Sequence, residues 1–179
     1  VVPKIGVRVP IIWNSSSDEK IMLANLENGV AHYGFTSLPN EADGNVFLSG
    51  HSSYYWWDKG QYKTVFALLD KLTQGDQAML QYDGKVYVYT MRVSVTVSPS
   101  DVSVTDPTEK PELSLMTCVP VGTSLRRLVV RFDLAKAYPA EYNGEASQPA
   151  TDDDAPRTET PKPLPTPINR DVIELIPAW

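Results

Sequence analysis

The chain has 179 residues and a net charge of −6 at neutral pH, and 42% of its residues are hydrophobic, as is usual for a globular protein. This length suits one domain with a sizeable core, and no apolar run is long enough to span a membrane. The absence of a basic stripe argues against a nucleic-acid partner. Cys118 is the single cysteine, which excludes an internal disulfide. Because the sequence starts at Val1 without a signal peptide, we expect a trimmed or processed product.

The first third of the chain predicts two strands around a helix. Apolar residues alternate with other residues over 5–9, which predicts a strand. Residues 16–29 predict a short helix, because Ser16 and Glu19 have the spacing of a capping box. The apolar run within 44–53 is compact and bounded by glycines, and it predicts a buried strand.

The middle of the chain predicts a helix, a hairpin and a loop. Residues 61–72 carry apolar side chains at helical spacing. Asp83-Gly84 separates two alternating runs, which is the clearest hairpin signal in the chain. Residues 98–112 are rich in turn formers and predict a long exposed loop. The last two strands are then expected over 113–118 and 127–134.

These elements predict a mainly β domain, either a barrel or a sandwich, followed by a tail. The composition changes abruptly after Tyr138. Residues 141–179 contain eight acidic and three basic residues, and seven of the 15 prolines. Such a segment cannot form a packed core. We therefore expect a folded domain over 1–140 and an acidic, proline-rich tail or spacer over 141–179.

Cys118 is either a small apolar core residue or a nucleophile. Cysteine chemistry requires a thiolate, a proton partner and a group that stabilises developing negative charge. The chain has two histidines, His32 and His51, each near a glycine-containing segment. Composition alone does not decide between the two alternatives, and a lone buried cysteine more often belongs to a core.

A family resemblance appears in the residues around Cys118. The sequence "SLMTC" followed by "VPVGTSLRRLVVRF" resembles the signature of the sortases, which are cysteine transpeptidases of the bacterial cell surface. The segment "GNVFLSGHSS" resembles the stretch that carries the family's catalytic histidine, which maps to His51. The resemblance covers residues 2–135 in the right order. Two features depart from the pattern: Ser114 replaces the usual threonine, and the segment after His51 is longer than in simple members.

The resemblance implies a closed or nearly closed β-barrel of about eight strands with a few short helices. It also implies that Cys118 attacks a carbonyl in an LPxTG-like sorting signal and forms a thioester. An amine of a cell-wall precursor or a pilin lysine then takes the acyl group. His51 serves as general acid and base, an arginine stabilises the oxyanion, and no metal or organic cofactor is needed. The family implies a location on the outer face of the bacterial membrane, and we expect that the family's membrane anchor has been removed from this chain.

Two arginines follow the cysteine, and strand alternation separates them. Arg126 shares a face with Leu128 and Val130, which predicts the barrel interior for that set. Arg127 shares a face with Val129 and is predicted to point outward, where a substrate groove would lie. We expect the strand to start at Arg127 and Arg126 to lie in the preceding turn. In the family the arginine also directly precedes an "LVVR"-like strand, so Arg127 is the predicted oxyanion stabiliser.

Three other residues are candidate substrate contacts. Thr117 precedes the cysteine, and His32 lies in "GVAHYG", which resembles a family segment. Otherwise His32 packs near the site. Trp56 belongs to an aromatic cluster after His51, which forms either a groove wall or the edge of a core. The acidic residues of the loop before the cysteine fit no compact calcium site, so no metal is expected.

Two rival functions remain open. One is a catalytically inactive sortase-like barrel that binds surface peptides, although His51, Cys118 and an arginine are all present. The other is a hydrolytic cysteine protease of a different fold. The papain-type C-G-x-C-W context is absent, which argues against that second alternative.

Overall fold

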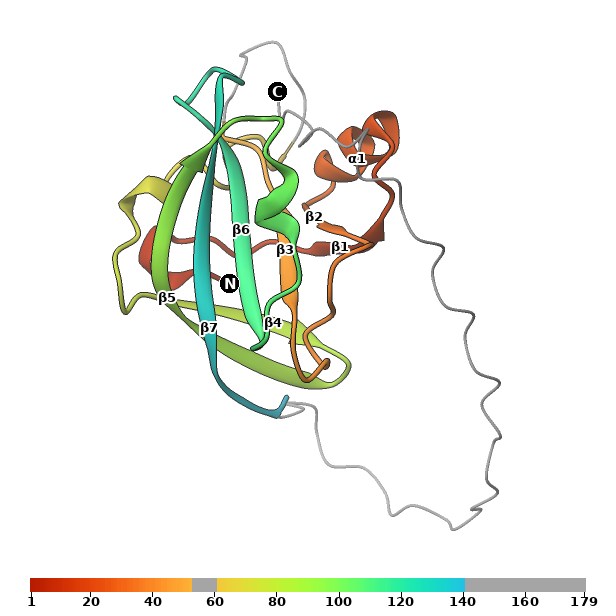
Figure 1. The fold of residues 1–179 in the computed structure, drawn as a ribbon, viewed down its shortest axis with the longest axis vertical. Helices are drawn as coiled ribbons and strands as arrows, with labels where there is room; N and C mark the ends of the chain where they lie inside the picture. Colours follow the sequence, from red (N-terminus) through yellow and green to blue (C-terminus); the bar gives the residue numbers. More distant parts are fainter. Residues whose placement is uncertain (53–60, 141–179) are drawn as a thin grey trace.

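The structure is a computed structural model that describes residues 1–52 and 61–140. In these residues a single sheet contains seven strands in the order β1-β2-β3-β6-β7-β5-β4 (Figure 1). The strands are β1 (Ile11–Ser15), β2 (Val30–Tyr33), β3 (Asn45–Ser49), β4 (Gln77–Tyr82), β5 (Lys85–Val97), β6 (Glu112–Val119) and β7 (Arg126–Pro139). The helical elements are α1 (Glu19–Leu26) and three short 3₁₀ turns, η1 (Pro3–Ile5), η2 (Leu69–Lys71) and η3 (Val102–Thr105).

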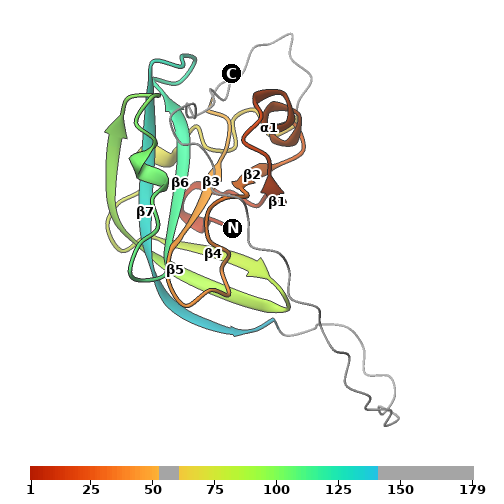
Figure 2. The same cartoon turned by 45° about the vertical axis from the view of Figure 1, so that its right-hand side comes forward.

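The sheet is mixed and strongly curved. The β1–β2 and β3–β6 pairs are parallel, and the other pairs are antiparallel. The ladder between the long strands β5 and β7 has two register shifts, at Val88/Tyr89 and at Met91/Val93. Such irregularities bend a strand and increase its twist. The sheet accordingly curls into a half-barrel (Figure 2). The expected mainly β barrel is confirmed, with seven strands in the described residues where about eight were predicted.

Two hydrophobic clusters lie on opposite faces of the sheet. We call the first the interior cluster, because it fills the concave side of the half-barrel. It includes Val30, Leu48, Phe66, Leu115 and Val130. The outer cluster lies on the other face, beneath α1 and η3. It consists of Met22, Leu26, Ala31, Tyr33, Phe47, Val104, Met116, Cys118 and Val129.

Several predicted elements are confirmed. The buried strand is β3, whose five residues are all buried. The hairpin is β4–β5, and both of its turn residues, Asp83 and Gly84, have positive φ. The last two strands are β6 and β7. The predicted helix is α1, although its N-cap is Asp18, which accepts a hydrogen bond from the Ile21 amide, and not Ser16.

The strand predicted over 5–9 is wrong. Pro3 opens the 3₁₀ turn η1, Gly6 takes a left-handed conformation, and the first strand begins only at Ile11. The apolar residues at 5, 7 and 9 still pack against the interior cluster. The alternation therefore arises because one side of this segment is buried, although the segment is not a strand of the sheet.

The helix predicted over 61–72 is also wrong. Amide hydrogen bonds in this segment run from a residue to the carbonyl three positions earlier, as in Leu69 to Phe66 and Leu72 to Leu69. This tighter winding buries Phe66, Leu69 and Leu72 and leaves Leu68 50% exposed. The loop predicted over 98–112 likewise contains η3, where Val104 and Thr105 are buried. None of the helices in the described ranges is long and apolar enough to cross a membrane.

Candidate active site

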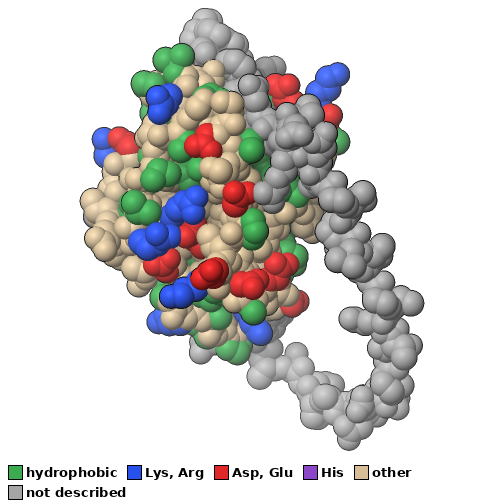
Figure 3. All heavy atoms as spheres, viewed as in Figure 1, with side chains coloured by type: hydrophobic (Ala, Val, Ile, Leu, Met, Phe, Trp, Pro, Cys, Tyr) green, Lys and Arg blue, Asp and Glu red, His purple; other side chains and the backbone are tan. Residues whose placement is uncertain are grey.

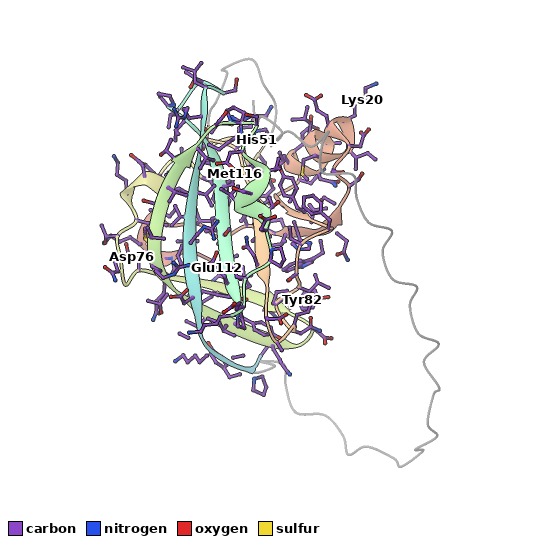
Figure 4. All side chains as sticks on the ribbon, viewed as in Figure 1. Lys20, His51, Asp76, Tyr82, Glu112 and Met116 are labelled. Carbon is purple, nitrogen blue, oxygen red and sulfur yellow. The ribbon has the colours of Figure 1, made fainter. Side chains whose placement is uncertain are left out.

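Cys118 lies near the end of β6, between β3 and β7. In the β6–β7 ladder its direct partner is Arg127. On the other side, β3 pairs with β6 in parallel up to Ser49 and Met116. Continuing this register by two residues places His51 level with Cys118. His51 lies two residues beyond the end of β3, so the three predicted catalytic residues lie at the same end of three neighbouring strands (Figure 4, which labels His51 at this end of the sheet).

The three residues also share one face of the sheet. Cys118 belongs to the outer cluster, as does Val129, two positions beyond Arg127. Phe47 of β3 is also in that cluster, and alternation carries the same face through Ser49 to His51. Cys118 and Arg127 are each 1% exposed, and His51 is 5% exposed. Charges that develop at so dry a site interact strongly, because little water screens them.

Arg127 is held by the turn that precedes it. Its Nη1 donates hydrogen bonds to the backbone oxygens of Ser124, at 2.8 Å, and Arg126, at 3.3 Å. These contacts tie the guanidinium to the β6–β7 turn while the ladder sets its Cα opposite that of Cys118. The planar guanidinium has five N–H donors, and these two bonds involve only one of its nitrogens.

Arg126 occupies a different position. The strand β7 begins at Arg126, one residue earlier than predicted, although the side chain is exposed as expected. Its Nε and Nη2 donate to the backbone oxygens of Val97, at 3.2 Å, and Thr96, at 3.3 Å. The side chain therefore extends across β5. The predicted alternation is confirmed, because Leu128 and Val130 lie in the interior cluster.

The segment around His51 is fixed at two points that the sequence did not reveal. The Thr117 hydroxyl donates to the Gly50 carbonyl at 2.8 Å, and the Phe66 amide donates to the His51 carbonyl at 2.9 Å. A Cβ on Gly50 would lie 2.4 Å from the Phe66 ring, so only glycine allows this packing. The signal for it was the glycine directly before His51. Thr117 thus contacts the histidine segment, on the face opposite to Cys118.

His32 lies on the other face of the sheet. Its neighbours along β2, Ala31 and Tyr33, belong to the outer cluster, so His32 points to the interior side, where its ring lies 5.2 Å from that of Trp13. The Asn14 amide donates to Nδ1 at 3.2 Å, which leaves the proton on Nε2 to bond the Ser37 carbonyl at 3.0 Å. Burial lowers the pKa of His32 to about 4. This setting favours a structural role for a neutral imidazole.

The other predictions about the site concern Trp56, the tail and metal binding. Trp56 and residues 141–179 lie outside the described residues. Within the described ranges, no group of three or more histidine, cysteine or acidic side chains could hold a metal ion.

Comparison with known proteins identifies the class. The sortase domain family matches residues 1–135. The chain is 32% identical to Sortase SrtE1 of Streptomyces coelicolor over 72% of its own length, and 30% identical to Sortase A of Bacillus anthracis over 74%. It spans 37% of the first relative and 57% of the second.

Solved structures agree with this match. The crystal structure of Sortase E1 from Streptomyces coelicolor with a tripeptide in the active site superposes with a TM-score of 0.65 at 29% identity, covering 81% of this chain and 91% of that one. The pilus-related Sortase C of Group B Streptococcus superposes with a TM-score of 0.63 at 28% identity, covering 76% and 65%. The fold is that of the sortase-type β-barrels. The chain belongs to the sortase family.

Proposed function

We propose that this chain is a cysteine transpeptidase that cleaves an LPxTG-like sorting signal and transfers the acyl group to an amine. The observation that supports the proposal is that Cys118 and Arg127 are direct partners in the β6–β7 ladder, with His51 two residues beyond the neighbouring end of β3. A nucleophile, a proton carrier and a fixed cation in such an arrangement suit acyl transfer through a covalent intermediate. Family membership supports the same reaction class.

In the first half-reaction, the Cys118 thiol gives its proton to His51, and the sulfur attacks the threonine carbonyl carbon of the sorting signal. A carbon–sulfur bond forms and negative charge develops on the carbonyl oxygen, where the Arg127 guanidinium stabilises it. The carbon–nitrogen bond then breaks, and His51 gives its proton to the leaving amine. The products are a thioester on Cys118 and the released C-terminal peptide.

In the second half-reaction, an incoming amine attacks the thioester carbonyl and gives its proton to His51. The carbon–sulfur bond breaks, so that Cys118 is regenerated with a new amide as product. Burial of the cysteine and arginine supports transfer over hydrolysis, because a dry site limits attack by water. An amine of a cell-wall precursor or a pilin lysine is the proposed acceptor.

Mass spectrometry of peptide products tests the proposal. LPxTG-like peptides would be incubated with the chain, with and without an added amine such as triglycine. We expect an amide product that contains both components, with the thioester trapped on Cys118 when the amine is omitted. Cys118→Ala should give neither species. Peptide binding without any product, together with no labelling of Cys118 by a thiol electrophile at neutral pH, would instead indicate an inactive, peptide-binding barrel.

A further inference from the structure

Side chains of the sheet attach the segment that contains η3 through one of its backbone carbonyls. The Val104 oxygen accepts a buried hydrogen bond from Asn45 Nδ2 at 3.0 Å, and Arg131 Nη2 approaches it at 3.4 Å. Asn45 belongs to β3 and Arg131 to β7, so donors from both sides of β6 converge on the same oxygen. In Figure 1 the short η3 helix lies in front of β6 and β3.

A buried carboxylate orients the arginine of this pair. Glu112, at the start of β6, is 4% exposed, and its Oε1 accepts from Arg131 Nη1 at 2.8 Å. Its other oxygen accepts from Arg92 of β5, which also donates to Asp133 at 2.9 Å. Hydrogen bonds between an arginine and a carboxylate are shorter and stronger than those between neutral groups, so the bond to Glu112 restrains the Arg131 side chain. Figure 3 shows acidic and basic side chains side by side on the lower part of this face.

The backbone supports the same attachment. The Gly44 amide donates to the Thr108 carbonyl at 2.8 Å, and the Glu112 amide donates to the Gly44 carbonyl at 2.9 Å. The segment is therefore held at its C-terminal end by the chain next to β3 and at its centre by the Val104 carbonyl. Only the second attachment depends on side chains, so it can be removed by substitution.

The attached segment also packs in the cluster that contains the proposed nucleophile. The Val104 side chain packs in the outer cluster with Met116 and Cys118. Glu112, Met116 and Cys118 alternate onto one face of β6, with Glu112 and Cys118 six residues and about 20 Å apart. Figure 4 labels Glu112 and Met116 along this strand. Val104 is thus held through its carbonyl near the charged group, while its side chain belongs to the cluster that contains Met116 and Cys118.

We propose that Asn45, Arg131 and Glu112 form a tether that holds residues 98–111 as a wall beside Cys118, and that they act as positioning residues for peptide binding. The expected effect on peptide binding rests on the proposed transpeptidase function. The tether itself does not depend on that function. A loosened wall weakens the binding of the sorting peptide while the chemical groups on β3, β6 and β7 keep their places.

Arg131→Met and a matched control, Arg92→Met, test the tether. Both remove one arginine from Glu112 and leave the other in place, but only Arg131 reaches Val104. In the unsubstituted chain the amides of Val102 and Asp106 donate to the backbone carbonyls of Ser100 and Ser103. In Arg131→Met we expect faster hydrogen exchange at these two amides. We also expect a KM for the sorting peptide about 3- to 10-fold higher, as suits loss of one hydrogen bond, with kcat nearly unchanged. Arg92→Met should change neither quantity.

The outcomes separate the tether from the proposed function. Equal exchange rates and equal KM values in the two variants would overturn the tether. If the unsubstituted chain forms no amide product, the transpeptidase proposal fails, and the exchange measurement still decides the tether. If Arg131→Met does not fold, Asn45→Ser removes the other donor to Val104 without disturbing the ion pairs. It should raise exchange at the same two amides, and unchanged exchange there would refute the tether.

Discussion

Cys118 and Arg127 are direct partners in the antiparallel β6–β7 ladder, on the same face of the sheet. Directly opposite residues in such a ladder have Cα atoms about 4.5–5.5 Å apart. The strand pairing itself thus sets the separation of the two Cα atoms, while the bond to the Ser124 carbonyl orients the guanidinium. Arg126, one residue away, has Val119 as its partner and an exposed side chain.

The two arginines should therefore differ sharply on substitution. Removal of one oxyanion donor costs about 10²–10³ in kcat in other enzymes, and we expect a loss of this size for Arg127→Ala in a steady-state assay of acyl transfer. Arg127→Lys should restore little, because an ammonium group cannot reproduce the planar guanidinium. Arg126→Ala should change kcat only a few-fold. A larger loss for Arg126→Ala than for Arg127→Ala would contradict the assignment.

Substitution of Cys118 should abolish the reaction and spare the fold. Cys118→Ala removes only the sulfur from the outer cluster, so we expect a stability loss of about 1 kcal/mol and an unchanged circular dichroism spectrum. No thioester or amide product should be detectable by mass spectrometry. Residual transfer in this variant would exclude the proposed mechanism, and an unfolded variant would indicate a structural thiol.

The two histidines should separate activity from stability. His51→Ala is expected to reduce turnover to background, because no proton carrier then remains at the proposed site. His32→Gln should retain most of the turnover, because His32 lies on the other face of the sheet. The reverse pattern in the transfer assay would contradict the assignment of His51.

Stability should fall on acidification, in part through His32. Burial lowers its folded pKa from 6.5 to about 4, so the unfolded chain takes up a proton first. The contribution of His32 is therefore fully present above pH 6.5 and is lost as the pH falls through about 4. Its size is about 3 kcal/mol. Urea unfolding at several pH values should show a shallower decline for His32→Gln. Parallel curves would mean that His32 titrates normally.

Thr117 should act on turnover through the histidine segment. Thr117→Val keeps the shape of the side chain but removes the hydrogen bond to the Gly50 carbonyl, next to His51. We expect a stability loss of about 1–3 kcal/mol, because the carbonyl is left without that donor, and a lower kcat with KM little changed. Thr117→Ser, which retains the hydroxyl, is the matched control and should restore kcat. Equal kcat in the two variants would show that this bond does not position His51.

The tail predicted over 141–179 can be tested by deletion. Because residues 145–179 are acidic, rich in proline and poor in core-forming residues, their removal should leave the melting temperature of the remaining domain nearly unchanged. Differential scanning fluorimetry of the full and shortened chains measures this directly. A fall of several degrees would mean that the tail contributes to the folded domain.

The sequence by itself determined the elements whose signals are local. Asp83-Gly84 encodes a hairpin turn because both residues tolerate positive φ, and the alternation after Arg127 encodes the two faces of β7. Residues 114–118 and the family pattern were enough to select Cys118, His51 and Arg127 as candidates. Local patterns failed at 5–9 and 61–72, because burial on one side looks alike in a strand, a helix and an irregular segment that lines a core.

Only the tertiary structure decided which of these residues meet. The β3–β6 register joins positions 67 residues apart, and no local preference encodes that distance. The same holds for the Val104 carbonyl, on which Asn45 and Arg131 converge from two strands, and for His32, whose position facing the interior follows from the pairing of β2 with β3. Contacts between distant segments form only when the whole sheet assembles, since each one depends on the registers of all the strands between them.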